Sequence, residues 1–238
     1  MDGFLIIDKP GGLTSHDVVA RVKRLLSVKK VGHAGTLDPF ATGILPLAIN
    51  GATKKISEIA EGTKEYRAVL ELGAETETGD GEGKIVRQEP VPPLTALQVE
   101  SVLSRFRGAI QQNTPSYSAV RYKGKPLYAW SREGKTTPII PRQVTIEMLT
   151  LEATEERRLT FFICCSQGTY IRSLLPDIAK ALGTCGFVSS LRRLRVGPFA
   201  LDQATTLMKL EEAVLKVKEK SDLDFTTLPG SVSLRHHD

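Results

Sequence analysis

The sequence has few residues of the kinds that mark metal centres and disulfide-bonded proteins. Its three cysteines, Cys164, Cys165 and Cys185, have neither the number of a disulfide framework nor the spacing of a C-x-x-C metal pair. Its four histidines likewise lack metal-ligand spacing. No G-x-x-x-x-G-K-[ST] loop and no G-x-S-x-G turn is present, so nothing supports a phosphate-binding NTPase or a serine hydrolase.

Long apolar runs are also missing. No stretch of about 20 apolar residues occurs, which argues against a membrane-spanning helix. The segment from Met1 to Asp8 lacks the basic start of a secretory signal, and its apolar run is too short for one. We therefore expect a cytoplasmic protein without a membrane partner, whose thiols are buried in a reducing compartment.

Positive charge is present but unevenly distributed. The net charge of the 238 residues is +5, whereas residues 202–238 carry −2, with five Lys or Arg and seven Asp or Glu. The rest of the chain therefore carries +7, which suits a polyanion such as nucleic acid but also an ordinary soluble surface. The basic residues cluster at Lys23, Arg24, Lys29 and Lys30, at Arg121, Lys123 and Lys125, and at Arg192, Arg193 and Arg195.

Apolar periodicity and turn residues predict the order of helices and strands. Residues 73–93 and 113–143 have no regular pattern and are predicted as long irregular segments. The order lacks regular β-α-β repeats, so we predict an α+β fold around one large sheet. Strands are expected near residues 5–7, 44–49, 66–72, 144–153, 158–165 and 191–196, and helices after Thr14 or Ser15, after Thr95 and over about 171–182, with Pro176 in the first turn or at a kink.

The glycine-rich segment from Gly32 to Gly43 is predicted as a loop that presents Asp38. Pro39 restricts the backbone of Asp38, and Gly35 and Gly43 permit tight turns on either side. A rigid scaffold presents a functional side chain in this way. Composition alone favours a structural reading, in which Asp38 makes an Asx-turn, because Asp-Pro loops are common.

A second candidate is Arg172, in the segment from Gly168 to Ser173 that opens a predicted helix. The helix dipole slightly disfavours a cation there, so Arg172 has either a specific carboxylate partner or the role of an ordinary surface arginine. Tyr66 lies on the apolar face of its predicted strand, where it is either a core residue or a ring that stacks on a base.

A series of motifs runs in order from residue 4 to about residue 200. The motifs are Asp8-Lys9-Pro10 with Thr14-Ser15, Gly32 to Pro39 with Ala41-Thr42-Gly43, Lys64-Glu65-Tyr66, Pro115 to Ala119 with Gly124 and Tyr128, Gly168 to Arg172, and Leu191-Arg192-Arg193. This series resembles the TruB family of tRNA pseudouridine-55 synthases. An ordered series of this length is far more specific than any one motif.

The resemblance implies the pseudouridine synthase fold, a large mixed and mostly antiparallel sheet flanked by helices. It also implies an isomerisation that detaches uracil from ribose and rejoins it through carbon, a reaction that requires no metal or cofactor. In this family the aspartate at the position of Asp38 is the nucleophile. Arg172 would be its ion-pair partner, and Tyr66 would stack on the uracil and help to remove the proton from C5.

The resemblance also assigns residues to the substrate and to the RNA around it. The target uridine is stacked in the T loop of tRNA and must be flipped out, which costs roughly a few kcal/mol. Residues 113–143 match a mobile insertion that clamps the RNA. Substrate-binding positions are matched by His33, Tyr66, Tyr170, Leu191 and Lys9, and phosphate contacts are expected from Lys123, Lys125, Arg132 and Arg192.

The C-terminal part departs from the family. Many bacterial relatives continue into a small RNA-binding PUA domain, whereas residues 202–238 are few and net acidic. We expect residues 1–201 to form the catalytic domain and residues 202–238 to form a helix near 210–217 and a tail from Ser221, without a complete PUA domain. The expected partner is tRNA, bound through its T arm by a monomer with no obligate protein partner. Two alternatives stay open: a pseudouridine synthase for another RNA, and an RNA-binding or tRNA-folding module without catalysis.

Overall fold

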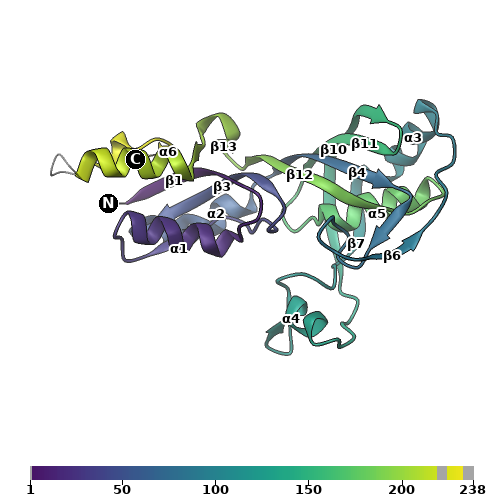
Figure 1. The fold of residues 1–238 in the computed structure, drawn as a ribbon, viewed down its shortest axis with the longest axis horizontal. Helices are drawn as coiled ribbons and strands as arrows, with labels where there is room; N and C mark the ends of the chain where they lie inside the picture. The colour runs from purple at the N-terminus through teal and green to yellow at the C-terminus, as the bar shows by residue number, and fades with distance from the viewer. Residues whose placement is uncertain (1, 219–223, 233–238) are drawn as a thin grey trace. The chain divides into compact units, whose positions relative to one another are not determined.

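The computed structural model describes residues 2–218 and 224–232, and it consists of two compact units (Figure 1). The first unit is formed by residues 1–66 and 192–238, and the second unit by residues 67–191. No helix within the described ranges is long and apolar enough to cross a membrane.

One large sheet accounts for most of the described strands. It has eleven strands, and antiparallel pairs predominate among them. Two of its strands, β4 (Lys64–Leu72) and β12 (Gly186–Val196), belong partly to each unit. The predicted α+β class with a mostly antiparallel sheet is therefore confirmed.

The sheet of the first unit is built on two largely apolar strands, of which nearly every residue is buried. β1 (Gly3–Lys9) and β3 (Thr42–Ile49) pair antiparallel along their whole lengths, which confirms the strands predicted there. β12 runs parallel to β3, with Arg193 opposite Gly43. The shorter strands of this part are β2 (Val31–His33), β13 (Phe199–Ala200), β14 (Thr205–Thr206) and β15 (Ser231–Val232).

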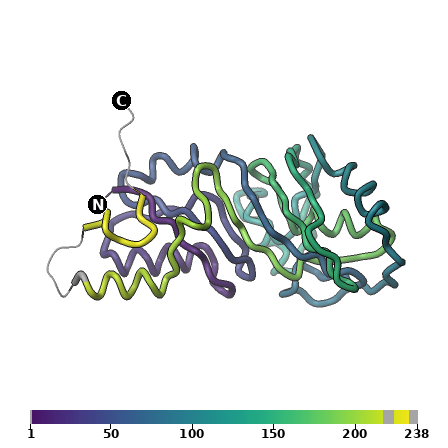
Figure 2. Tube along the Cα trace, turned by 90° about the horizontal axis from the view of Figure 1, so that it is seen from above, coloured from purple at the N-terminus to yellow at the C-terminus, as the bar shows by residue number. Residues whose placement is uncertain are grey.

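Helices cover both faces of this sheet because its apolar residues alternate between two cores. On one face α1 (Ser15–Leu25) begins at a capping box, in which Thr14 and Asp17 exchange side-chain-to-backbone hydrogen bonds. α6 (Leu207–Lys218) lies beside α1 (Figure 2). The core there contains Leu5, Ile7, Val18, Val22, Leu45, Leu47, Leu210 and Val214. On the other face lie η1 (Asn50–Lys55) and α2 (Ile56–Glu61), with Phe4, Ile6, Ile44, Ala48, Ala52 and Ile59 in the core.

The C-terminal residues contribute to the first unit. The predicted tail from Ser221 is wrong for residues 224–232, where η4 (Phe225–Thr227) and β15 add buried Phe225 and Leu228 to the core beside β1. Two isolated apolar residues give no periodicity from which this packing could be predicted. Residues 221–223 and 233–238 lie outside the described residues. The predicted boundary at residue 201 stays a prediction.

The second unit continues the sheet in the order β12-β4-β11-β10-β7. β10 (Pro141–Glu155) pairs antiparallel with β7 (Gly108–Asn113) and with β11 (Arg158–Cys165), so the two strands predicted near 144–153 and 158–165 are confirmed. The helices are α3 (Ala96–Leu103), which starts at the predicted Thr95 capping box and continues as η2 (Ser104–Phe106), and α5 (Ile171–Ala181).

Pro176 lies inside α5 beyond its first turn, so the first of its two predicted positions is wrong and the predicted kink stays a prediction. Two further predictions for this unit need correction. The segment 73–93 is not only a loop, since β5 (Ala74–Thr76) and β6 (Ile85–Gln88) form a hairpin in it. The segment 113–143 includes the hairpin of β8 (Arg121–Tyr122) and β9 (Lys125–Pro126), the short helix α4 (Leu127–Arg132) and the start of β10. β6 is exposed throughout, and β5, β8 and β9 have only two or three residues each, so the alternation that marks a half-buried strand is absent.

Candidate active site

The loop between β2 and β3 carries Asp38, which is partly buried. The residues on either side of Asp38 are held by hydrogen bonds from residues near the start of the chain. The hydroxyl of Ser15 accepts a hydrogen bond from the backbone N of Leu37 at 2.8 Å and donates one to its carbonyl at 3.1 Å. The backbone N of Gly12 donates to the carbonyl of Pro39 at 2.9 Å. Asp38 is therefore held between two anchored neighbours, as a presented side chain requires.

Lys9 also holds the loop that carries Asp38, through the carbonyl of Pro39. Its side chain is fully buried, and Nζ donates to the carbonyls of Pro10, Leu13 and Pro39 at 2.9, 2.6 and 3.1 Å. A buried ammonium is stable only where acceptors surround it. These contacts give Lys9 a structural role beside Asp38, and its predicted contact with the substrate stays a prediction.

We expect Lys9→Met to destabilise the protein by about 3 kcal/mol, because three partly buried carbonyl oxygens lose their charged donor. Denaturant unfolding followed by circular dichroism measures this as a lower midpoint. Lys23→Met, at an exposed position on α1, is the matched control and should leave the midpoint unchanged. An unchanged midpoint for Lys9→Met would contradict this account of the loop.

Arg193, on β12, is the third anchor of the Asp38 loop and is only 1% exposed. Its guanidinium donates to the carbonyls of Ile44 at 2.9 Å, Thr36 at 3.3 Å and Gly35 at 3.1 Å. It also shares a hydrogen bond with the side chain of Tyr66. Burial lowers the pKa of Arg193, while Tyr66 and the charge of Asp38 act in the opposite direction. In the sequence, Arg193 stands out only as part of a basic cluster and of the Leu191-Arg192-Arg193 motif, and neither marks it as part of the site.

Tyr66 and His33 lie in the first unit with Asp38. Tyr66 is 6% exposed on β4, so its predicted position on the apolar face is confirmed. His33, at the end of β2, is partly buried, and burial followed by the charge of Arg193 lowers the pKa of its ring. Its Nδ1 atom has no hydrogen-bond partner among the described residues. A neutral imidazole is therefore favoured next to the loop.

Arg172, in the first turn of α5, is buried with Asp80 in the second unit. Nε lies 3.5 Å from Oδ2 of Asp80, and the two side chains are 4% and 6% exposed. The other nitrogens donate to the carbonyls of Thr78 and Tyr117, each at 2.8 Å. Asp80 therefore supplies a carboxylate partner to Arg172, and no pattern in the sequence indicated this residue. Pairing of Arg172 with Asp38 stays a prediction.

In the second unit Tyr170 is held by Gln112, and Leu191 is buried. The buried side chain of Gln112 accepts from the backbone N of Tyr170 at 2.7 Å and donates to its carbonyl at 3.0 Å, which fixes the start of α5. Leu191 is buried on β12. Gln112 sits in a strand of mixed polarity, and no signal in the sequence marks it as a partner of Tyr170.

The predicted phosphate contacts fall into two groups. In the segment around α4, cations lie over aromatic rings: Lys123 over Tyr122, Lys125 over Trp130 and Arg132 over Tyr128, at 5.4, 5.6 and 5.5 Å from the ring centroids. Lys125 is also ion-paired with Glu133. Arg192, in the first unit, pairs with Asp8 at 2.7 Å and donates to Thr42, so its charge is already matched by a carboxylate.

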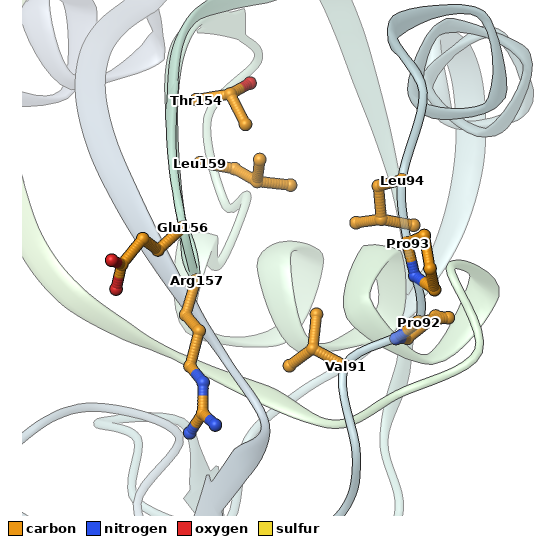
Figure 3. Close-up of a pocket in the computed structure, with 8 residues that line it drawn as sticks. All are labelled: Val91, Pro92, Pro93, Leu94, Thr154, Glu156, Arg157 and Leu159. Atoms are coloured by element: carbon orange, nitrogen blue, oxygen red, sulfur yellow. The ribbon is translucent and has the colours of Figure 1, made fainter.

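A hollow of about 370 Å³ on the second unit is lined by other residues (Figure 3). Arg157 and Glu156 stand on one side of it, and Leu94 with two prolines on the other (Figure 3). None of the predicted site residues lines this hollow.

Known structures share this architecture. A chain in the crystal structure of a Cbf5-Nop10-Gar1 complex aligns with a TM-score of 0.73 and 31% identity, over 93% of this chain and 57% of that one. A chain in the structure of an H/ACA RNP bound to a substrate RNA aligns with a TM-score of 0.70 and 30% identity, over 93% and 56%. The fold shared with these chains, together with the match of residues 23–171 to a family of pseudouridylate synthases, defines the class: a pseudouridine synthase, which is an isomerase.

The particular family follows from the sequence matches. The N-terminal domain of the TruB family pseudouridylate synthases matches residues 23–171, and the C-terminal domain of tRNA pseudouridylate synthase B matches residues 172–235. The chain belongs to the TruB family.

Three bacterial relatives illustrate the extent of the match. The tRNA pseudouridine synthase B of Syntrophus aciditrophicus is 45% identical over 99% of this chain and 74% of its own length. The enzyme of the same name from Geobacter sulfurreducens is 46% identical over 89% and 70%, and that from Coxiella burnetii is 43% identical over 99% and 76%. The resemblance predicted from the motifs is therefore confirmed over nearly the whole chain.

Proposed function

We propose that this chain converts uridine 55 in the T loop of tRNA to pseudouridine, in the cytoplasm, with Asp38 as its nucleophile. The observation that carries the proposal is the fixed presentation of Asp38 between Ser15, Lys9 and Arg193. The relatives called tRNA pseudouridine synthase B support the choice of tRNA. An RNA-binding module would not need a carboxylate on a loop anchored in this way.

The reaction breaks the bond between N1 of uracil and C1′ of ribose and forms a bond between C5 and C1′. One proton leaves C5 and one is added at N1, so no electrons are gained or lost. The Asp38 carboxylate attacks either C1′ or the uracil ring, forms a covalent intermediate and is released when the new bond is complete. Tyr66 lies against the ring and helps to remove the proton from C5.

The uridine reaches Asp38 only after it leaves the base stack, because a carboxylate cannot approach C1′ or the ring inside the folded T loop. His33, Tyr170 and Leu191 are proposed to surround the flipped nucleotide. The neutral ring favoured for His33 suits contact with an uncharged base. Arg172, with its charge matched by Asp80, is proposed to orient Asp38 as well.

The segment around α4 is proposed to contact phosphates. Its cations lie over aromatic rings and close to solvent, an arrangement that suits a backbone and splayed bases together.

The test is an assay on a T-arm stem-loop labelled with tritium at C5 of the target uracil. Isomerisation releases the tritium to water, and digestion of the RNA then yields pseudouridine. An anticodon stem-loop labelled in the same way is the control RNA and should release none. If the protein binds the T-arm stem-loop but releases no tritium, it is an RNA-binding module without catalysis. If it releases tritium only from the anticodon stem-loop, its substrate is another RNA.

Replacing Lys125 and Arg132 by alanine together is expected to weaken T-arm binding without lowering the rate at saturating RNA. Each lost phosphate contact reduces the slope of log Kd against log salt concentration by about 0.7 to 0.9. The slope of the double variant should therefore be lower by about 1.5. Fluorescence anisotropy at several salt concentrations gives this slope. The matched control is Lys209→Ala with Lys216→Ala, two exposed lysines of α6. An unchanged slope for the first pair would remove these residues from the RNA interface.

A further inference from the structure

Arg193 is among the largest fully buried side chains of the described residues, and no step of the reaction has been assigned to it so far. It is fully enclosed where β12 runs parallel to β3. The two backbones are very close there, since a Cβ on Gly43 would lie 2.2 Å from the carbonyl oxygen of Arg193. Gly43 has a φ of +102°, which also requires glycine. The packing therefore fixes Arg193 against the strand that follows the Asp38 loop.

One guanidinium spans both ends of this loop. Its acceptors are Gly35 and Thr36, just before Asp38, and Ile44, at the start of β3 after it. Because the guanidinium is planar, its donors have fixed directions and hold these carbonyls in one arrangement. A small movement of Arg193 would therefore move the loop that carries Asp38.

The same guanidinium reaches Tyr66, which lies on a different strand. It shares a hydrogen bond with the tyrosine side chain and is close enough to Asp38 for the two charges to interact. One cation therefore connects the two groups assigned to nucleophilic attack and to removal of the C5 proton.

We propose that Arg193 is a positioning residue for the isomerisation, which fixes the hydroxyl of Tyr66 relative to the Asp38 loop. This inference rests on the proposed function. Two buried lysines of the same unit argue against a purely structural role for Arg193. Lys9 donates to loop carbonyls, and Lys64 donates to the carbonyls of Ala60 and Gly62 at 2.7 and 3.1 Å. The fold therefore accepts a lysine where buried carbonyls need only a cationic donor. Position 193 instead has an arginine, whose planar guanidinium also reaches Tyr66.

The test replaces Arg193 by lysine, which keeps the charge and can satisfy carbonyls as Lys9 and Lys64 do. We expect Arg193→Lys to unfold cooperatively and to bind the T-arm stem-loop with a Kd within about threefold of wild type, while its single-turnover rate falls roughly 100-fold. Arg195→Lys is the matched control: it lies two positions along β12, is 40% exposed in an ion pair with Glu65, and should keep the wild-type rate.

A double-variant comparison separates the link to Tyr66 from the loop alone. If Arg193 acts through Tyr66, adding Arg193→Lys to Tyr66→Phe should slow the residual single-turnover rate by less than about threefold. An undiminished 100-fold effect in the phenylalanine background would overturn the link. A wild-type rate for Arg193→Lys, or loss of its cooperative unfolding, would overturn the proposal too. A wild-type enzyme that releases no tritium would instead refute the proposed function.

Discussion

Replacing Asp38 by asparagine is expected to reduce pseudouridine formation by at least about 10⁴-fold, because the amide keeps the shape of the side chain but cannot act as the nucleophile. The Kd for the T-arm stem-loop should stay within about threefold of wild type, since Asp38 acts after the uridine is bound. Tritium release under single-turnover conditions and fluorescence anisotropy measure the two quantities separately.

Asp202→Asn is the matched control, because it removes an exposed carboxylate from η3 in the same unit. It should keep the wild-type rate. Asp38→Ala should be as inactive as Asp38→Asn, since the nucleophile is lost in both. Full turnover by either Asp38 variant would show that the nucleophile is a different residue.

The loop around Asp38 shows what the sequence could and could not reveal. Its glycines and Pro39 indicate a presented side chain, but the same composition fits a simple turn, and only the ordered series of motifs decides between them. The contacts that fix the loop come from Lys9, Ser15 and Arg193. The Arg193 contacts join residues 149 to 158 positions apart, and no local pattern predicts a pairing of that separation.

The helices and long strands were predictable because their signals are local. α1 and α3 begin at the capping boxes expected from Thr14 and Thr95, and β1, β3 and β11 follow from their apolar residues. The hairpin of β5 and β6 was not predictable, because Ile85 and Val86 are exposed and their neighbours are polar. Periodicity reports burial, so a strand that buries little gives little signal.

Arg172 illustrates the same limit at the second cluster. Its position at a helix start predicts an acidic partner, and the resemblance implies Asp38. Within the second unit the partner is Asp80, while the other acceptors include the carbonyl of Thr78, 94 residues earlier in the chain. Asp80 lies in the polar segment after β5, where composition predicts only a loop.

We expect Arg172→Lys to lower the single-turnover rate by roughly 10²- to 10³-fold, because an ammonium cannot replace the directed contacts of a buried, planar guanidinium. Those contacts join Arg172 to Asp80 and to the carbonyls of Thr78 and Tyr117. Tritium release from the T-arm stem-loop measures the loss, and the Kd for the RNA should change by less than about threefold.

Arg158→Lys is the control for this variant, since Arg158 pairs with Glu71 in the same unit but is 61% exposed, and a surface pair contributes about 0 to 1 kcal/mol. It should keep both the wild-type rate and the wild-type unfolding midpoint.

Asp80→Asn tests the pair through its other member. The buried guanidinium of Arg172 loses its matching charge, which costs about 3 to 5 kcal/mol of stability. If Arg172 orients Asp38, then Asp80→Asn should also slow the reaction wherever the variant is still folded. A wild-type rate for Arg172→Lys would confine the pair to the stability of the second unit.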